Sequence, residues 1–196
     1  MRFAGNLSLL LYKECWMSSL VNPETPRRLF LALWPEARER QSIARLAARA
    51  TGRQRRIADD LLHLTLVFLG KTSANRLAAY EAALADLPVP DMELVLDRYG
   101  YWPESRILWL GFSHTPPELY ELVAELHRRL RDCGFAPEDR AFQAHVTLAR
   151  RFSGPVPTEL PPMPIHWRVN EVVLVESTPP PRITHYQVLH YWPARR

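Results

Sequence analysis

The sequence predicts an α+β fold with two pseudo-symmetric lobes and a central cleft between them. The pattern His-x-Thr-Leu occurs twice, at residues 63–66 and 145–148, each time within an apolar run that is typical of a strand. Each copy also follows a strand-like and a helix-like segment, so the order strand, helix, motif strand is repeated along the chain. Two copies of one such unit are expected to pack about an approximate two-fold axis. That arrangement would bring both motif strands to the centre of the molecule, facing each other.

The first unit is expected to contain three regular elements: strand 28–34, helix 36–50 and motif strand 62–69. The opening strand is almost wholly apolar, as in a buried strand, and Pro35 ends it. The helix carries apolar residues at helical spacing, and Gly52 closes it. A basic connector, residues 53–58, leads to the motif strand, which Gly70 ends.

The rest of the chain is expected to contain a helix over 74–86, an antiparallel strand pair over 92–99 and 105–112, a helix over 116–133, the second motif strand over 143–150, and closing strands near 166–176 and 184–191. Ser73 precedes the first of these helices as a cap, and Gly134 follows the second as a C-terminal stop. Residues 100–103 are expected to form the loop between the paired strands. The proline-rich segment 155–164 is also expected to be a loop.

The length of 196 residues fits one large domain or two small lobes that share an interface. We expect residues 1–25 to be an N-terminal extension, either disordered or the product of a wrongly assigned start codon, and residues 26–196 to form a single bilobal domain. The formal net charge is +4, and of the 25 basic residues all but two are arginines. Arginine binds phosphate through a planar fork of donors, so this bias fits an anionic substrate, although a GC-rich genome would produce it too.

The cysteines and the hydropathy argue against a secreted or membrane protein. Cys15 and Cys133 form neither a metal-ligand spacing nor a disulfide framework, which favours a reducing, cytoplasmic location. No apolar run approaches the ~20 residues that a membrane-spanning helix needs. The start of the chain is faintly similar to a secretion signal, but its apolar stretch is short and no small-residue cleavage site follows it.

The two motifs together suit the cleavage of a phosphate ester without a metal. Because side chains alternate along a strand, His63 and Thr65 share one face, as do His145 and Thr147. Opening a cyclic phosphodiester requires one group that takes a proton from water and another that gives a proton to the leaving ribose oxygen, and imidazole does both near neutral pH. The threonine hydroxyls could hold the non-bridging oxygens. A strand histidine is more often a core residue, and two histidines could bind zinc, but the repetition favours catalysis and no third zinc ligand is evident.

Several further residues are candidates for the walls of the site. Arg150 and Arg151 follow the second motif, and strict alternation puts Arg151 on the face of the histidine unless a bulge or the strand end reverses the order. The rings on which a base could stack are Phe30, Trp34, Tyr101 and Trp102. The first two lie in a buried-looking strand, so core packing is the alternative for them. Tyr186 could border the cleft. The remaining histidines are expected to be structural or exposed: His114, His127, His166, His185 and His190.

The residues around both motifs resemble a known family. Residues 63–70 read His-Leu-Thr-Leu-Val-Phe-Leu-Gly, and residues 145–150 read His-Val-Thr-Leu-Ala-Arg. Both are similar to the paired motifs of the two-histidine (2H) phosphoesterases, and within them to the RNA 2′,3′-cyclic phosphodiesterases, also called 2′-5′ RNA ligases. The opening strand and the closing segment 186–193 resemble that branch as well, so the resemblance covers about residues 27–193.

This resemblance implies two lobes of antiparallel sheet with outer helices around a central cleft, and no metal or other cofactor. It implies the opening of a 2′,3′-cyclic phosphate at an RNA 3′ end to leave a 2′-phosphate. By the same likeness, His63 would protonate the leaving 3′ oxygen and His145 would activate water. Thr65 and Thr147 would bind the phosphate, with help from Arg150.

Two other functions stay open at this point. The chain could be a 2H phosphodiesterase for another small cyclic phosphate, or a non-catalytic protein that binds RNA ends. The expected partner is an RNA 3′ end with a 2′,3′-cyclic phosphate, or a nucleotide, and not a membrane. The protein is expected to be a monomer, and the reverse reaction, 2′-5′ ligation of RNA, is a further expectation.

Overall fold

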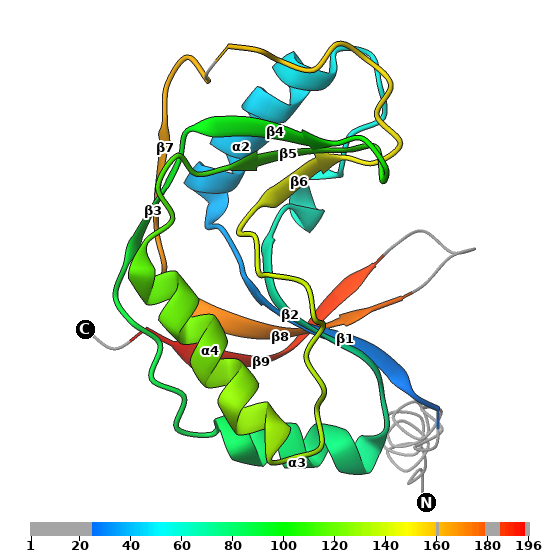
Figure 1. The fold of residues 1–196 in the computed structure, drawn as a ribbon, viewed down its shortest axis with the longest axis vertical. Helices are drawn as coiled ribbons and strands as arrows, with labels where there is room; N and C mark the ends of the chain where they lie inside the picture. Colours follow the sequence, from blue (N-terminus) through cyan, green and yellow to red (C-terminus); the bar gives the residue numbers. More distant parts are fainter. Residues whose placement is uncertain (1–24, 160, 179–184, 195–196) are drawn as a thin grey trace, which may run out of the picture.

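The computed structural model describes residues 25–159, 161–178 and 185–194 (Figure 1). In chain order the elements are β1 (Arg27–Leu33), α2 (Ala37–Thr51), the 3₁₀ turn η1 (Asp59–Leu61), β2 (Leu64–Thr72), α3 (Ala74–Leu84), β3 (Glu93–Leu96), β4 (Arg98–Trp102), β5 (Ile107–Gly111), α4 (Pro117–Arg131), β6 (Val146–Ala149), β7 (Ile165–Arg168), β8 (Glu171–Ser177) and β9 (Tyr186–Pro193). The extension predicted over residues 1–25 lies outside the described residues except for its last position, and the domain boundary there stays a prediction.

The two motif strands lie next to each other at the centre of a seven-stranded sheet, as predicted. The strand order is β4-β5-β6-β2-β1-β8-β9, and every neighbouring pair is antiparallel. The order is symmetric about the boundary between β6 and β2, because β5 flanks β6 as β1 flanks β2. The units β1-α2-β2 and β5-α4-β6 are therefore related by an approximate two-fold axis, and the α+β class with two pseudo-symmetric lobes is confirmed.

The sheet is narrow at its centre. β1 and β2 pair from Arg27↔Thr72 to Leu33↔Leu64, whereas β2 and β6 pair only at Leu64↔Val146 among the described residues. The strands consequently diverge into two lobes, one formed by β4, β5 and β6 and the other by β2, β1, β8 and β9 (Figure 1). The two histidine motifs lie at the junction of the lobes.

The helices exchange lobes. α2 follows β1 but contacts β6 and β7, and α4 follows β5 but contacts β2 and α3. Figure 1 shows α2 beside the β4-β5-β6 lobe and α4 beside the other lobe. Each helix buries an apolar stripe, such as Leu119, Leu122 and Leu126 in α4, so each unit contributes to the core of the other lobe. This exchange ties the lobes together although the central strands share a single pair.

The predicted helix ends are confirmed. The Ser73 hydroxyl accepts a hydrogen bond from the Arg76 amide at 3.4 Å, which caps α3. Gly52 and Gly134 follow α2 and α4 with positive φ values of 57° and 76°. Both positions need a residue without a Cβ atom to adopt this conformation without strain.

The prediction that strand 92–99 pairs with strand 105–112 is wrong for most of the first strand. β3 instead pairs with β7 in a separate two-stranded sheet, and the partner of β5 is β4, which covers most of the predicted loop 100–103. Gly100 permits this pairing, because a Cβ atom there would lie 1.9 Å from Cζ2 of Trp109 on the facing strand. The glycine that suggested a loop is required for the close approach of a tryptophan ring.

The single closing strand predicted near 166–176 is also wrong. β7 belongs to the two-stranded sheet and β8 to the large one, with a break between them at Val169 and Asn170. The Val169 amide donates to the Met92 carbonyl, and the Asn170 carbonyl accepts from the Ala194 amide. These backbone bonds to two other segments redirect the chain from one sheet to the other.

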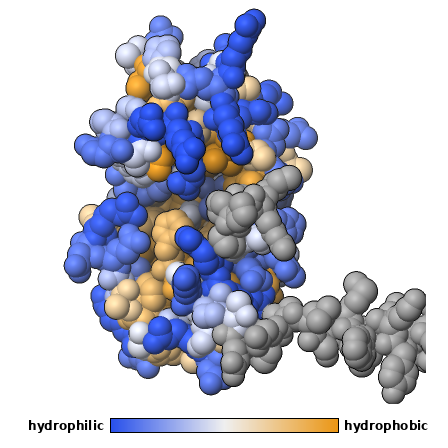
Figure 2. All heavy atoms as spheres, turned by 90° about the vertical axis from the view of Figure 1, so that its right-hand side faces the viewer, coloured by the Kyte–Doolittle hydropathy of each residue, from blue (hydrophilic) through white to orange (hydrophobic). Residues whose placement is uncertain are grey.

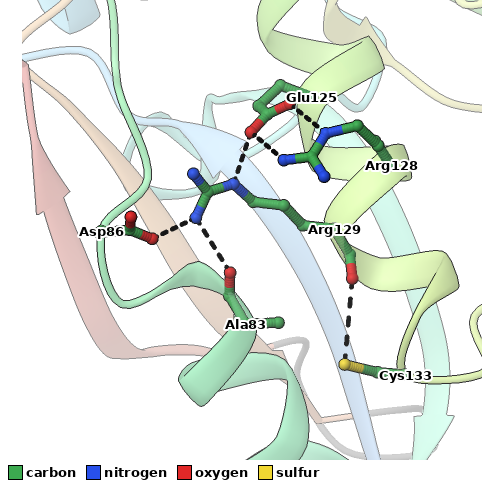
Figure 3. A network of polar contacts seen from close by, with 6 residues as sticks. All are labelled: Ala83, Asp86, Glu125, Arg128, Arg129 and Cys133. Carbon is green, nitrogen blue, oxygen red and sulfur yellow. Dashed lines mark hydrogen bonds and ion pairs between the residues drawn. The ribbon is translucent and has the colours of Figure 1, made fainter.

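A polar network joins α3 to α4 (Figure 3). Nε of Arg129 donates to Glu125 at 2.6 Å, while its Nη1 contacts Asp86 and donates to the Ala83 carbonyl at 3.1 Å. The thiol of Cys133 lies 3.9 Å from the Arg129 carbonyl. Hydrogen bonds from Arg128 and Arg129 lower the pKa of Glu125 to about 2.

In the part of the chain that the structure describes, no helix combines the length and apolarity needed to cross a membrane.

Candidate active site

An apolar floor lies on the face of the sheet opposite the main core. Leu29, Leu31 and Leu33 of β1 point into the main core, and the alternation of the strand turns Phe30 and Ala32 to the other side. There they pack with Val173 and Val175 of β8, and Trp34, Tyr186 and Val188 cover this small cluster. The floor provides the low-dielectric wall against which the first histidine lies.

His63 is held by a backbone carbonyl and enclosed by aromatic rings. Its Nδ1 lies 2.7 Å from the Leu61 carbonyl, and because a carbonyl only accepts, Nδ1 carries the proton. Nε2 lies 3.1 Å from the Thr65 hydroxyl. Trp34 stacks parallel to the imidazole at 5.3 Å with a 6° angle between the planes, and the rings of Phe30 and Tyr186 lie at 4.9 and 5.3 Å.

His145 has the same backbone contact in the other lobe. Its Nδ1 lies 2.8 Å from the Gln143 carbonyl, which again fixes the proton on Nδ1 and leaves Nε2 available. Its ring meets Trp102 edge-on at 4.6 Å and Trp109 at 6.3 Å. Each histidine therefore bonds to the carbonyl two residues before it and directly precedes its strand. The approximate two-fold symmetry of the lobes thus extends to the hydrogen bonds of the two imidazoles.

The pair Leu64↔Val146 places the four motif side chains on one face. Both of these residues are 0% exposed and point into the main core. Side chains of the adjacent positions point to the opposite face, and the antiparallel register sets His63 against Thr147 and Thr65 against His145. All four are partly buried. The charge of His145 acts on His63, so the two imidazoles, and with them the neighbouring hydroxyls, lie near each other at the junction of the lobes.

Burial lowers the pKa of both histidines. The pKa of His63 falls to about 4, mainly because its imidazolium would lose hydration, and the charges of Arg150 and His145 add to the effect while the Leu61 carbonyl opposes it. The pKa of His145 is lowered for the same main reason, with the Gln143 carbonyl in opposition. Both rings are thus neutral in the free protein at neutral pH.

Arg150, rather than Arg151, acts on the two histidines. β6 ends at Ala149, and Arg151 adopts a left-handed conformation with φ of 56°, so the strict alternation that would favour Arg151 no longer applies. The positive charge of Arg150 lowers the pKa of His63 and, after the larger effect of Arg140, the pKa of His145. Burial raises the pKa of the Tyr186 hydroxyl, and the charge of Arg150 opposes this effect. A cation near both imidazoles is suited to an anionic group between them.

The structure brings together more residues than the sequence singled out. Phe30 is buried, as the core-packing alternative predicts, and its ring also contacts His63; stacking on a base stays a prediction. Trp34 and Trp102 each lie against a histidine, whereas Tyr101 packs against Phe152 instead. Trp109 was not predicted; its register partner is Thr147, a relation that a sequence without known strand pairs does not reveal. Among the described residues, no three side chains of His, Cys, Asp and Glu are grouped as metal ligands would be.

Known proteins with related sequences and structures share this architecture. The family model of the 2′-5′ RNA ligase superfamily matches residues 32–179. The RNA 2′,3′-cyclic phosphodiesterase of Escherichia coli (strain K12) is 34% identical over 171 residues, which are 85% of this chain and 96% of that protein. The crystal structure of E. coli LigT complexed with 3′-AMP superimposes with a TM-score of 0.79 at 32% identity, covering 88% of this chain and 99% of LigT. The structure of E. coli LigT complexed with phosphate gives 0.77 at 31% identity, with the same coverage.

These matches extend over most of the chain and include both histidine motifs. The likeness of the motif segments to the two-histidine phosphoesterases agrees with the matched family. The chain belongs to the 2′-5′ RNA ligase superfamily.

Proposed function

We propose that this protein hydrolyses RNA 2′,3′-cyclic phosphate ends to 2′-phosphomonoesters, with His63 and His145 as the acid–base pair. The observation that supports this most strongly is the matched state of the two imidazoles. Each donates from Nδ1 to a backbone carbonyl and so leaves Nε2 for proton exchange, one in each lobe. Relatives named for this reaction, and a LigT structure that contains 3′-AMP, support the same assignment.

The proposed reaction is an in-line displacement at phosphorus. Nε2 of His145 takes a proton from water as its oxygen bonds to phosphorus, and the bond from phosphorus to the ribose 3′ oxygen breaks. The Nε2 proton of a protonated His63 passes to that leaving oxygen, so the 2′-phosphate remains and charge is balanced. The hydroxyls of Thr65 and Thr147, together with Arg150, stabilise the non-bridging oxygens as their negative charge grows.

Binding of the anionic phosphate prepares the site for this cycle. Without substrate both imidazoles are neutral, because burial lowers the pKa of each. A negative charge between them favours an imidazolium, so substrate binding is expected to be accompanied by uptake of one proton. The approximate symmetry also permits the opposite assignment, with His145 as the acid.

An oligonucleotide that ends in a 2′,3′-cyclic phosphate tests the proposal directly. We expect turnover in EDTA and a product with a terminal 2′-phosphate. A 3′-phosphate would mean that either the roles of the histidines or the pose of the substrate is exchanged. Loss of activity in EDTA with recovery in zinc would contradict the metal-independent mechanism. Absence of turnover on RNA ends, with turnover of another small cyclic phosphate, would replace the substrate; binding of RNA ends without any turnover would leave a non-catalytic binder.

Ligation follows the same displacement with a different nucleophile. A 5′-hydroxyl that takes the place of water would attack the cyclic phosphate and form a 2′-5′ linkage with the same two histidines. We further propose that the protein is monomeric and acts in the cytoplasm, and that its bilobal domain begins near residue 26. Size-exclusion chromatography with light scattering tests the first of these statements, and activity of a chain lacking residues 1–25 tests the last.

A further inference from the structure

Four exposed arginines surround the end of β6. They are Arg53 and Arg55 in the connector after α2, Arg106 in the turn before β5, and Arg151 after β6, and they are named the arginine rim here. No ion pair of these four is found within the described residues, whereas the neighbouring Arg56 pairs with Asp59 at 3.0 Å. Other carboxylates close in sequence are Glu104 and Asp60, both exposed. The rim therefore keeps an excess of positive charge.

Backbone and side-chain hydrogen bonds hold the three segments side by side. Ile57 in the connector donates to the Leu148 carbonyl at 2.7 Å, and the amide of Ser153 donates to Gln54 Oε1 at 2.9 Å. On the other side, the Phe152 amide donates to the Arg106 carbonyl at 2.9 Å. Gln54 lies between Arg53 and Arg55, Phe152 follows Arg151, and Arg106 is itself a member of the rim. Ile57 and Ser153 each lie two positions from the nearest rim arginine, and Leu148 lies three positions from it. The four guanidinium groups thus start from one continuous edge of the molecule.

Two members of the rim adopt a strained conformation. Arg106 and Arg151 are the two non-glycine residues with positive φ in the described chain, at 52° and 56°. An arginine in this region is disfavoured relative to glycine, because its Cβ atom crowds the backbone. A turn of this kind would be more stable with glycine, so the presence of arginine at both positions points to a use for its side chain.

The rim continues from the proposed site. Arg151 follows Arg150, whose charge acts on both histidines, and lies at most about 13 Å of extended chain from Thr147. Figure 2, which views the molecule from the right-hand side of Figure 1, shows hydrophilic residues gathered over the part that holds β4, β5 and β6. A strand of RNA whose cyclic end lies between the histidines must leave the site on its 5′ side.

We propose that the arginine rim binds the backbone phosphates of single-stranded RNA that precede the terminal cyclic phosphate. The inference rests on the proposed function and assigns its substrate as an oligonucleotide rather than a free nucleotide. Arginine is suited to this role because its fork of donors fits phosphate, and the contacts would be independent of base sequence.

Glycine substitution at the two strained positions provides a test in which folding is retained. The double variant R106G/R151G removes two charges and places glycine where φ is already positive, so its Tm is expected to equal or exceed that of the wild type. The variant R76Q/R131Q removes two exposed arginines from α3 and α4 and is the matched control. R53Q/R55Q examines the connector side of the rim independently.

The measurement compares kcat/KM on a nucleoside 2′,3′-cyclic phosphate with that on a seven-nucleotide RNA ending in the same group, between 50 and 300 mM NaCl. For R106G/R151G we expect kcat/KM on the RNA to fall about tenfold at low salt. The slope of log(kcat/KM) against log[NaCl] should become shallower by about 1.4, because each lost contact between arginine and phosphate contributes about 0.7. The nucleoside reaction should change less than twofold, and R76Q/R131Q should match the wild type on both substrates.

Two results would overturn the inference: equal losses on both substrates, or an RNA reaction that neither rim variant alters. A binding measurement with the same RNA ending in a 3′-phosphate distinguishes failure of this inference from failure of the proposed function. If the wild type turns over neither substrate, weaker RNA binding by R106G/R151G than by R76Q/R131Q would still support the rim. Equal binding by these two variants would reject it.

Discussion

Leu64 pairs with Val146 across the two central strands, and in the described chain this is the only pair that joins β2 to β6. Both side chains are completely buried, so the residues on either side of them face away from the core. One pair is enough to fix the register of the motifs, while the strands beyond it remain free to diverge. The site is therefore built at the narrowest part of the sheet, with one histidine in each lobe.

Removal of either imidazole is expected to abolish most of the activity. We expect His63→Ala and His145→Ala each to lower kcat on a nucleoside 2′,3′-cyclic phosphate by about 10²–10⁴-fold, which is the usual contribution of a general acid or base. His114→Ala is the control, because His114 is exposed and lies outside the site. Circular dichroism should show an unchanged fold in all three. Activity near that of the wild type after either motif substitution would reject the two-histidine mechanism.

The stability of the fold should depend on the protonation of His63. The pKa of His63 is about 4 in the folded protein, compared with the ordinary 6.5. Between these values the unfolded chain binds a proton that the folded protein does not, so this contribution to stability is present above pH 6.5 and is lost as the pH falls toward 4. The difference corresponds to about 3 kcal/mol.

Urea unfolding of the wild type and of His63→Gln at pH 7.5 and pH 4.5 measures this dependence. Glutamine does not titrate, so the loss of unfolding free energy between the two pH values should be smaller in the variant. Carboxylates that titrate over the same range affect both proteins equally and cancel in the comparison. Equal pH dependence in the two proteins would show that burial does not lower the pKa of His63.

Trp34 is expected to control the hydration of His63. Its ring lies parallel to the imidazole at 5.3 Å and excludes water from one face. Trp34→Leu should raise the pKa of His63 toward its ordinary value and lower kcat about tenfold through loss of alignment, and Trp34→Phe should recover most of both properties. An NMR titration of the His63 ring proton reports the pKa. A lower rate with an unchanged pKa would restrict Trp34 to packing.

Arg129 is expected to stabilise the contact between α3 and α4. Its guanidinium group is largely buried and joins Glu125 to the Ala83 carbonyl and to Asp86, as drawn in Figure 3. Arg129→Met removes one donor to Glu125, which Arg128 still binds, and the contacts to the Ala83 carbonyl and Asp86. It should lower the free energy of unfolding by about 1–3 kcal/mol. Arg128→Met is the matched control, because Arg128 is exposed and should leave the urea midpoint nearly unchanged. Both variants should keep the kcat of the wild type.

The repeated strand–helix–strand pattern was sufficient to predict the symmetric order of the central strands. Polar alternation around Leu64 and Val146 also predicted which motif side chains share a face, because this property depends only on neighbouring residues. The partners of β3 and β4 could not be predicted in this way. Strands that are adjacent in sequence usually pair, and β3 is the exception because it pairs with the distant β7. The partner of β5 is β4, where Gly100 leaves room for the ring of Trp109.

The chemical groups of the site could be predicted from the residues alone: two imidazoles and two hydroxyls in strands of matching pattern. The surroundings of these groups depend on tertiary contacts, namely the stacking of Trp34 on His63 and the effect of Arg150 on both histidines. The two kinds of feature differ in the sequence distance over which their causes act. Alternation and helical periodicity act between residues a few positions apart, whereas desolvation and charge depend on which distant segments the folded chain brings into contact.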